Sequence, residues 1–414
     1  MMTRENNCSR FEKGFHLATL LLLLLLLLAS FYYMSDARKL SDESFNFRQI
    51  TRFLNDNWSL EPGMNAIPGY QALVALVMKA FGKRGIFSAR LISTGISYAG
   101  VLVFYLLTWK LYGRPSPVKT LQFALFPLLF PFFPLVYMDI LGLVLVLLAF
   151  YLVLWRRYTL AGLVGMLSIL ARSNNIAWFA FLLVWIVYEH YGWDWRALLQ
   201  TPLKFIRLTW SYWFGMAAFA TFLLVNQGIA LSDRSMQPLF KFSLGNLYFD
   251  LLLFAFLFLP LNIANLRPIL LSLRKKKWLL PALLLLFAIY FFTFRSDHPF
   301  NLAEPDYYPR NQLLKLTAES YLWRVVFFLP VAFGLLALGV ARLRQQRFYW
   351  LYPFTLLGLL PFWLIEPRYA FVPFSLWILF KEEQSPLVEW LTIGLYALLA
   401  IPMLVLMKQE LFFI

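Results

Sequence analysis

Cysteine is almost absent from this sequence, and charged residues are scarce. The only cysteine, Cys8, precedes the first apolar run, so the chain can form neither a disulfide framework nor a metal site built from cysteines. Charged residues make up 14% of the chain, while 61% of its residues are apolar. A composition with so little charge excludes an ordinary soluble domain.

The sequence is instead rich in long apolar runs. Runs of about 18 or more apolar residues recur along the chain, which predicts an all-α protein that crosses a membrane several times. The 37 Lys and Arg outnumber the 21 Asp and Glu, and the net charge is +16. Because the basic residues lie in short loops between apolar runs, we expect them to fix topology and to contact membrane lipids. We expect no nucleic-acid partner.

The first apolar run, which extends to Tyr33, is longer than the apolar part of a signal peptide and ends without a clear small-x-small cleavage pattern. We therefore expect a retained membrane anchor and not a cleaved signal. Arg4, Arg10 and Lys13 precede this run, which predicts a cytoplasmic N-terminus. The stretch from residue 35 onward then emerges on the opposite side.

The apolar segment from Ile67 to Phe81 decides the topology of everything after it. It has only about 15 residues, fewer than the roughly 20 that a span needs, and it contains Lys79. If it crossed the membrane, the basic stretches 274–277 and 342–347 would lie outside. We therefore predict an interfacial helix here, which keeps both basic stretches in the cytoplasm.

This topology predicts one integral membrane domain over residues 1–414, with about twelve to thirteen membrane helices. The predicted spans are 15–34, 88–110, 118–137, 140–155, 159–171, 175–190, 207–226, 247–266, 278–294, 321–341, 348–365, 369–380 and 387–407. The predicted outer loops are 35–87, which carries interfacial helices, and 227–246 and 295–320.

Polar stretches stand beside the apolar spans at five places, and the predicted topology puts all five at one membrane face. They are "SDESFNF", "VYMDILG", "ARSNNIAW", "SDHPFNLAEPDYYPRN" and "IEPRYAF". Ionisable residues at the ends of apolar helices are costly unless they line a wet cavity or a site. The sequence therefore predicts an outward-facing catalytic or binding chamber.

Each stretch also has a purely structural explanation. Asp42 with Glu43, and likewise Asp139, have the residue types that start a helix. Arg172 and Asn175 can satisfy a helix end, although such polar groups inside an apolar hairpin favour a function.

The last two stretches leave the same choice open. His298 has no second histidine nearby, so we expect a hydrogen-bonded structural residue and no metal site. Glu366 and Arg368 can pair across the Pro367 bend. Alternatively, the Arg368 guanidinium can bind a phosphate with two parallel hydrogen bonds.

These stretches, in this order, resemble the endoplasmic-reticulum family of dolichyl-phosphate-glucose-dependent α-1,2-glucosyltransferases, part of the GT-C class of membrane glycosyltransferases. The family adds the terminal glucose of the lipid-linked oligosaccharide. The matching residues are Asp42, Glu43 and Phe45; Glu61, Pro62, Pro68 and Gly69; Tyr137 and Asp139; Ala171, Arg172, Asn175, Ile176 and Trp178; His298, Pro299, Phe300, Leu302, Ala303 and Tyr307; and Glu366, Arg368 and Tyr369.

The resemblance implies a GT-C-like helix bundle that works as an inverting hexosyltransferase without a cofactor. A polyprenyl-phosphate sugar, in this family a glucose donor, would give its hexose to a glycan acceptor, expected to be lipid-linked. The reaction would take place on the lumenal or periplasmic side of an endoplasmic-reticulum or bacterial inner membrane. Where the family has Asp-Asn-Arg-His before the tyrosine, this chain has Glu304-Pro305-Asp306, so part of the family's substrate contact set is missing. The loops also look shorter than those of the eukaryotic enzyme, which suits a bacterial relative with a different lipid-linked or protein-linked acceptor.

The resemblance also implies roles for individual residues. Asp42 is the preferred general base over Glu43, because the class places this role on a first-loop aspartate. Arg368 and Arg172 are expected to bind the donor phosphate. The residues expected to position the sugar or the acceptor are Asp139, Asn175, His298, Asp306, Tyr307 and Glu366.

Two other functions fit a polytopic chain with polar groups. A transporter or flippase of lipid-linked sugars would place its ionisable residues near the bilayer midplane and show inverted halves. Here the carboxylates cluster at one predicted surface and no internal repeat is visible. A non-catalytic subunit of a glycan-assembly complex would tolerate loss of the acidic pair.

Overall fold

The computed structural model describes residues 2–192, 194–231, 241–302 and 308–413, with side chains from residue 14 onward except that of residue 195. Asp306 and Tyr307, both predicted to contact the sugar or acceptor, lie outside these ranges. The described residues form helices and no named strand, with one isolated β-bridge between Leu343 and Lys381. The all-α prediction is therefore confirmed.

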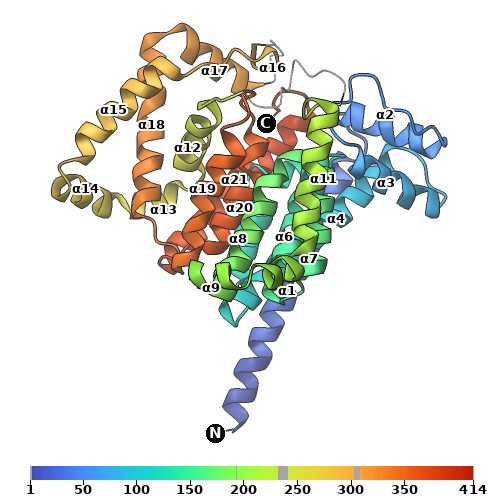
Figure 1. The fold of residues 1–414 in the computed structure, drawn as a ribbon, viewed down its shortest axis with the longest axis horizontal. Helices are drawn as coiled ribbons and strands as arrows, with labels where there is room; N and C mark the ends of the chain where they lie inside the picture. Colours follow the sequence, from blue (N-terminus) through green and yellow to red (C-terminus); the bar gives the residue numbers. More distant parts are fainter. Residues whose placement is uncertain (1, 193, 232–240, 303–307, 414) are drawn as a thin grey trace.

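A tight bundle forms the centre of the molecule (Figure 1). Its helices come from the first half of the chain and from the C-terminal part. They are α1 (Met2–Met34), α4 (Ile86–Tyr112), α5 (Pro117–Ala124), α6 (Met138–Leu154), α7 (Tyr158–Ala171), α8 (Ile176–Tyr191), α11 (Trp210–Asn226), α19 (Leu351–Leu359), α20 (Phe371–Phe380) and α21 (Pro386–Lys408).

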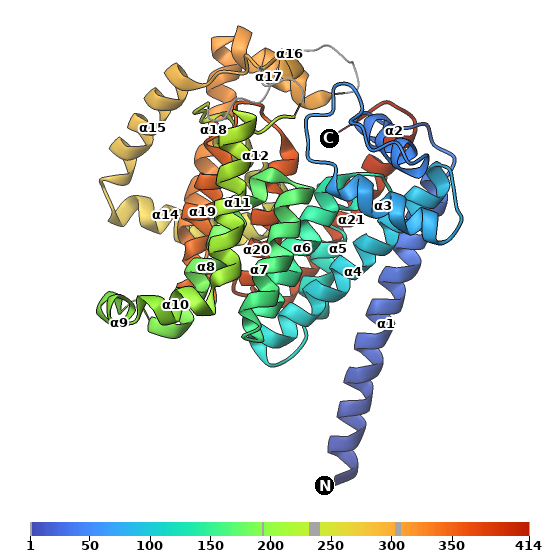
Figure 2. The same ribbon diagram turned by 45° about the vertical axis from the view of Figure 1, so that its right-hand side comes forward.

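Other helices lie around this bundle (Figures 1 and 2). Beside the end opposite the N-terminus lie α2 (Glu43–Leu54) and α3 (Gly69–Ala80). The remaining helices are α9 (Trp195–Gln200), α10 (Pro202–Leu208), α12 (Gly245–Leu257), α13 (Leu259–Ala264), α14 (Leu266–Lys275), α15 (Leu279–Thr293), α16 (Pro299–Leu302), α17 (Pro309–Glu319) and α18 (Tyr321–Val340). The short 3-10 helices are η1 (Phe130–Phe132), η2 (Ser173–Asn175), η3 (Gln346–Trp350) and η4 (Pro367–Ala370).

Several of these helices suit a bilayer. In the described ranges, four are long and apolar enough to cross one: the Gly14–Met34 part of α1, and α4, α18 and α21. The number rises to six if the bent pairs α10–α11 and α14–α15 each count as one span. The chain is thus an all-α polytopic membrane protein. The count of twelve to thirteen spans stays a prediction, since many helices are shorter.

Two predicted spans differ from the structure. The predicted span 348–365 ends early, because α19 ends at Leu359, and the predicted span 118–137 is wrong. Residues 118–137 do not form a single helix, because α5 ends at Ala124 and only η1 follows before α6. Pro127, Pro131 and Pro134 lack the amide hydrogen that a helix interior needs, so they break the helix. The irregular segment is buried by neighbouring helices, which is the condition for non-helical backbone at membrane depth.

A helix, α3, forms within the predicted interfacial segment and packs against α2, while its place at the membrane interface stays a prediction. Both run across the direction of the bundle helices at the bundle's end (Figure 1). One face of α2 is buried. From that face, the Asn46 side-chain Nδ2 donates to the Val136 carbonyl at 2.9 Å, which links α2 to the proline-rich segment. The first outer loop therefore has a fixed position on the bundle.

All three predicted outer loops meet at this end of the bundle. The Leu231 amide donates to the Asn65 carbonyl at 3.1 Å, and the Tyr308 hydroxyl donates to Ser41 Oγ at 2.6 Å. The C-terminus also lies here, as Figure 1 shows, with Phe413 against Tyr137. The N-terminus lies at the far end of α1.

Aromatic packing and close helix contacts hold the other parts together. Phe348 of η3 stacks on Phe380, the last residue of α20, with ring centroids 4.2 Å apart, which marks the opposite end of the bundle. On the outer group, Gly334 lets α18 approach α12 closely. A methyl group there would collide with the Leu251 carbonyl oxygen, so only glycine fits.

Candidate active site

Arg368 is the centre of an ion-pair cluster at the end of the bundle where the outer loops meet. It belongs to η4, a short turn that begins at Pro367 and leads into α20. Its Nη1 lies 2.9 Å from Asp42 Oδ2 and 3.4 Å from Asp139 Oδ2, and its Nε lies 3.0 Å from Glu366 Oε1. Four residues from three distant parts of the sequence thus share one site.

Asp42 stands at the N-cap position of α2 but does not cap it. Its side chain accepts no hydrogen bond from the helix amides. The carboxylate instead faces Arg368 and keeps 48% of its surface exposed. The capping explanation of the "SDESF" stretch therefore does not apply to the Asp42 side chain. Asp42 is also the most accessible of the three carboxylates around Arg368.

Glu43, its neighbour, points the other way and is fully buried against Arg90. Arg90 Nε and Nη2 donate to the two carboxylate oxygens at 2.9 and 2.7 Å. The Leu40 and Val136 amides also donate to this carboxylate, at 3.2 and 3.0 Å. Because each of its carboxylate oxygens accepts two hydrogen bonds, Glu43 holds the first outer loop in place. This geometry favours Asp42 as the base and a positioning role for Glu43.

Asp139 joins a second arginine to the cluster. It lies in the first turn of α6, and its Oδ1 is 2.8 Å from Arg172 Nη1, an ion pair rather than an aligned hydrogen bond. Arg172 follows the end of α7 with extended backbone, which turns its side chain toward the cluster. Its guanidinium also lies over the Tyr369 ring, 5.4 Å from the centroid.

Glu366 is clamped between Arg368 and a third arginine, Arg310. Arg310 Nη1 lies 2.7 Å from Glu366 Oε2, and both side chains are buried. Burial alone would raise the pKa of Glu366, but the charges of Arg310 and then Arg368 outweigh it and lower the pKa to about 2. Glu366 is therefore ionised at neutral pH, and its negative charge balances part of the charge around Arg368.

Buried amides shape the loop that carries Glu366. Asn246 Oδ1 accepts from the Glu366 amide at 3.0 Å, and its Nδ2 donates to two carbonyls of the same loop. Asn301 Nδ2 donates to the Ile365 carbonyl at 3.0 Å, and Asn301 Oδ1 accepts from the Ile365 amide at 2.9 Å. These bonds fix the backbone on which the Glu366 and Arg368 side chains are displayed.

Two other residues predicted to contact the sugar or the acceptor are buried. Asn175 is buried, and its Nδ2 donates to the Ser168 carbonyl at 3.2 Å. His298 is also buried, its Nδ1 accepts from the Phe300 amide at 3.1 Å, and its ring lies against Trp363. The geometry favours structural roles for both, and direct contact with a sugar stays a prediction.

The predictions from the sequence do not include Arg90 or Arg310. Arg90 had a usable signal, because an arginine inside the apolar segment 86–112 needs a buried partner. Arg310 is the next-to-last residue of the polar stretch "SDHPFNLAEPDYYPRN", but nothing in the sequence tells which carboxylate it meets. In the described part of the chain, no three His, Cys, Asp or Glu side chains gather to hold a metal ion. The absence of a metal site stays a prediction.

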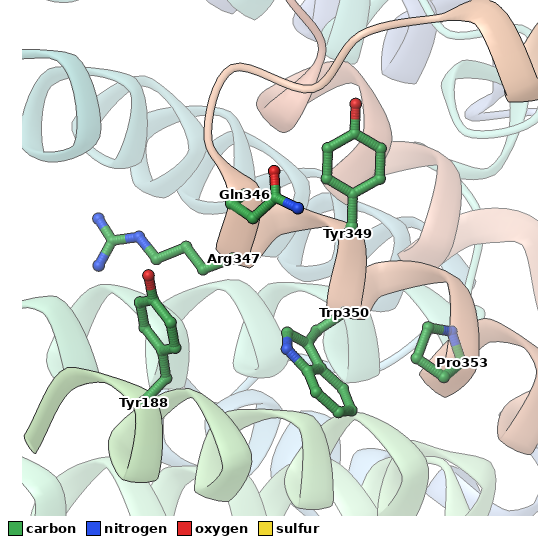
Figure 3. A pocket seen from close by; sticks show the side chains of 6 residues that line it. All are labelled: Tyr188, Gln346, Arg347, Tyr349, Trp350 and Pro353. Atoms are coloured by element: carbon green, nitrogen blue, oxygen red, sulfur yellow. The ribbon is translucent and has the colours of Figure 1, made fainter. Parts of the chain in front are cut away.

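An open cavity of about 410 Å³ lies far from this cluster (Figure 3). Figure 3 shows Arg347 and Trp350 of η3 facing Tyr188 of α8 across it. It is at the opposite end of α20, because η3 packs on the last residue of that helix while Arg368 precedes its first. The cavity does not belong to the candidate site.

Comparison with known proteins gives the family. A family model described as DIE2/ALG10 matches residues 37–196 and 187–379, most of the chain and all six charged residues of the cluster. The chain belongs to the DIE2/ALG10 family. The resemblance inferred from the sequence is therefore confirmed.

Individual relatives of the DIE2/ALG10 family are similar at low identity, and each is named Dol-P-Glc:Glc(2)Man(9)GlcNAc(2)-PP-Dol alpha-1,2-glucosyltransferase. The rat protein is 26% identical over 245 residues, 47% of this chain and 52% of the relative. The Arabidopsis thaliana protein is 24% identical over 456 residues, which cover 85% of this chain and 88% of the relative. The chain thus matches about half the length of the rat relative. No solved structure matches it.

The charge balance around Glu366 gives a test. Glu366→Gln should lower stability at neutral pH, because a pKa lowered from 4.5 to about 2 is worth about 3 kcal/mol. That stability is complete above about pH 4.5 and is lost as the pH falls toward about 2, because the unfolded chain takes up the proton first. Thermal unfolding of both proteins in detergent at about pH 7 and about pH 3.5 measures the difference.

The Tm gap between the parental chain and Glu366→Gln should narrow in acid. Glu319→Gln, which changes an exposed carboxylate at the end of α17, is the matched control and should leave Tm unchanged at both pH values. A gap of equal size at both pH values would show that Glu366 is not a strongly stabilised anion.

Proposed function

We propose that this protein is an inverting glycosyltransferase that moves glucose from a polyprenyl-phosphate donor to a glycan acceptor. The observation that carries the proposal is the pairing of Asp42 with Arg368. A half-exposed carboxylate that caps nothing lies 2.9 Å from an arginine that three carboxylates surround. Membership of the DIE2/ALG10 family, whose similar relatives are named glucosyltransferases, gives the reaction class.

The charges of the cluster determine where a donor phosphate binds. Three guanidinium groups, from Arg172, Arg310 and Arg368, balance three carboxylates. A phosphate anion that enters must therefore displace a carboxylate from an arginine. Asp139 and Glu366 are buried, with 3% and 4% of their side chains exposed, so Asp42 is the one released. Arg368 then binds the phosphate, with Arg172 beside it.

The same exchange prepares the base. Released from Arg368, the Asp42 carboxylate accepts the proton of the acceptor hydroxyl while the hydroxyl oxygen attacks the anomeric carbon. The bond between that carbon and the phosphate oxygen breaks, and the bonding electrons leave with the polyprenyl phosphate. Arg368 stabilises the departing phosphate, and a single in-line displacement inverts the anomeric configuration.

The substrates follow from the relatives' names together with this site. Those names give dolichyl-phosphate glucose as donor and a lipid-linked oligosaccharide as acceptor for the relatives. For this chain we propose the same classes, a polyprenyl-phosphate glucose and a lipid-linked glycan. Asp306 and Tyr307 remain proposed contacts to the sugar or the acceptor, as do Asp139, Asn175, His298 and Glu366 from the described residues.

We propose that the active end faces the lumen or periplasm, with the whole chain as one integral membrane domain. The basic stretches 274–277 and 342–347 would then face the cytoplasm, as the positive-inside tendency requires. Single cysteines at Asn57 and Gln345, introduced after Cys8→Ser, test this in sealed membranes with an impermeant maleimide. Labelling of the Gln345 position from the outside would reverse the assignment.

The catalytic role of Asp42 gives the sharpest test of function. Asp42→Asn should reduce sugar transfer by about 10²- to 10⁴-fold, because it removes a positioned general base and keeps the side-chain shape. Its Tm should stay close to that of the parental chain, since the carboxylate is half exposed. Transfer from polyprenyl-phosphate glucose to a lipid-linked acceptor by the purified full chain is the measurement.

Two variants separate catalysis from structure. Asp56→Asn changes an exposed carboxylate of the same loop and should transfer at the parental rate. Glu43→Gln should lower the Tm, unlike Asp42→Asn, because it weakens the buried pair with Arg90. Parental transfer rates in the Asp42→Asn variant would overturn the proposed mechanism.

A further inference from the structure

A second open cavity, of about 460 Å³, lies on α2, close in sequence to Asp42. One wall is a single face of that helix, because its lining positions recur at helical spacing. The lining residues are Lys39, Phe47, Arg48, Thr51, Arg52, Asn55, Asn57 and Glu61. The opposite face of α2, which includes Glu43 and Asn46, is buried and fastens the helix to the bundle.

The cavity contains an excess of positive charge. Lys39, Arg48 and Arg52 stand against one carboxylate, Glu61. The Nε atoms of Arg48 and Arg52 donate to separate oxygens of Glu61, at 2.7 and 2.9 Å. Hydrogen bonding to Arg48, which outweighs partial burial, lowers the pKa of Glu61. Glu61 is therefore a fixed anchor for both arginines.

This anchoring leaves hydrogen-bond donors of Arg48 and Lys39 that do not bind Glu61. Among the described residues, Arg48 Nη1 and Nη2 have no hydrogen-bond acceptor, and neither does Lys39 Nζ. The Arg48 guanidinium is held from one side by Glu61 and lies over the Phe45 ring, 4.3 Å from the centroid. A guanidinium fixed in this way, beside two more cations, suits a phosphate group.

The surroundings indicate that such a phosphate is carried by a lipid. Trp58 and Leu60, beside the cavity-lining residues Asn57 and Glu61, expose 61% and 42% of their surface. Leu76 of the adjoining α3 is also exposed, at 56%. Exposed aromatic and apolar side chains next to basic ones are typical of the headgroup level of a bilayer. These exposed side chains suit a cavity at the level of lipid phosphates.

We propose that this cavity binds the diphosphate of the lipid-linked acceptor. The inference rests on the proposed function and adds a second anion site to it. Arg48 lies six residues along α2 from Asp42, about 9 Å at the helical rise, so the base and the cavity keep a fixed separation. Arg368 binds the donor phosphate, while Arg48, Arg52 and Lys39 hold the acceptor at its lipid end as its glycan reaches Asp42.

The experiment uses the full chain and two readouts. Arg48→Ala should raise the KM for the lipid-linked acceptor about 10-fold, because it removes charge-assisted hydrogen bonds, and leave the donor KM at the parental value. Farnesyl diphosphate, a short polyprenyl diphosphate without a glycan, should compete with the acceptor and not with the donor. Its binding, measured by calorimetry, should weaken about 10-fold in Arg48→Ala.

Lys83→Ala is the matched control, since it removes an exposed cation of the same outer loop outside the cavity. It should match the parental chain in both readouts. An unchanged acceptor KM in Arg48→Ala, or farnesyl diphosphate binding that does not depend on Arg48, would overturn the proposal. So would equal competition by phosphatidylglycerol vesicles, which would make the cavity a general headgroup site.

The two proposals fail differently. If the parental chain binds farnesyl diphosphate through Arg48 but transfers no sugar, the diphosphate site stands and the proposed function fails. If it transfers sugar while Arg48→Ala keeps the parental acceptor KM, the function stands and the diphosphate site fails.

Discussion

The arrangement of this protein's active end depends on one largely enclosed cation, Arg368, with 12% of its side chain exposed. An arginine removed from water is costly unless carboxylates surround it, and three do so here from separate parts of the chain. Asp42 comes from the first outer loop, Asp139 from the start of α6, and Glu366 from the turn before α20. To satisfy Arg368, the fold must bring these three segments to one place.

The carboxylates of the first loop show how neighbouring residues take different roles. Glu43 is fully enclosed by Arg90 and two backbone amides, so it cannot leave without exposing a buried charge. Asp42 shares Arg368 with two other anions and is half exposed, so its release costs less. A fixed pair thus holds the loop, while an exchangeable pair beside it is available to a substrate phosphate.

The sequence predicts which charged residues gather better than it predicts the backbone around them. Charge at the end of an apolar helix is costly without a site, which predicts a role for Asp42, Asp139, Arg172, Glu366 and Arg368. The structure brings all five together. The prediction of a span over the proline-rich segment 118–137 is wrong, because hydropathy does not register the missing amide hydrogens. The sequence does not reveal the role of Arg310, because its partner, Glu366, is more than fifty residues away along the chain.

The central claim is that a donor phosphate replaces Asp42 on Arg368. The most direct measurement is an experimental structure of the full chain with a non-cleavable polyprenyl-phosphonate glucose. We expect a phosphonate oxygen about 2.7 to 2.9 Å from the Arg368 guanidinium, and the Asp42 carboxylate separated from Arg368 and turned toward the sugar. A bound donor with the Asp42–Arg368 pair intact and its phosphonate elsewhere would contradict the account.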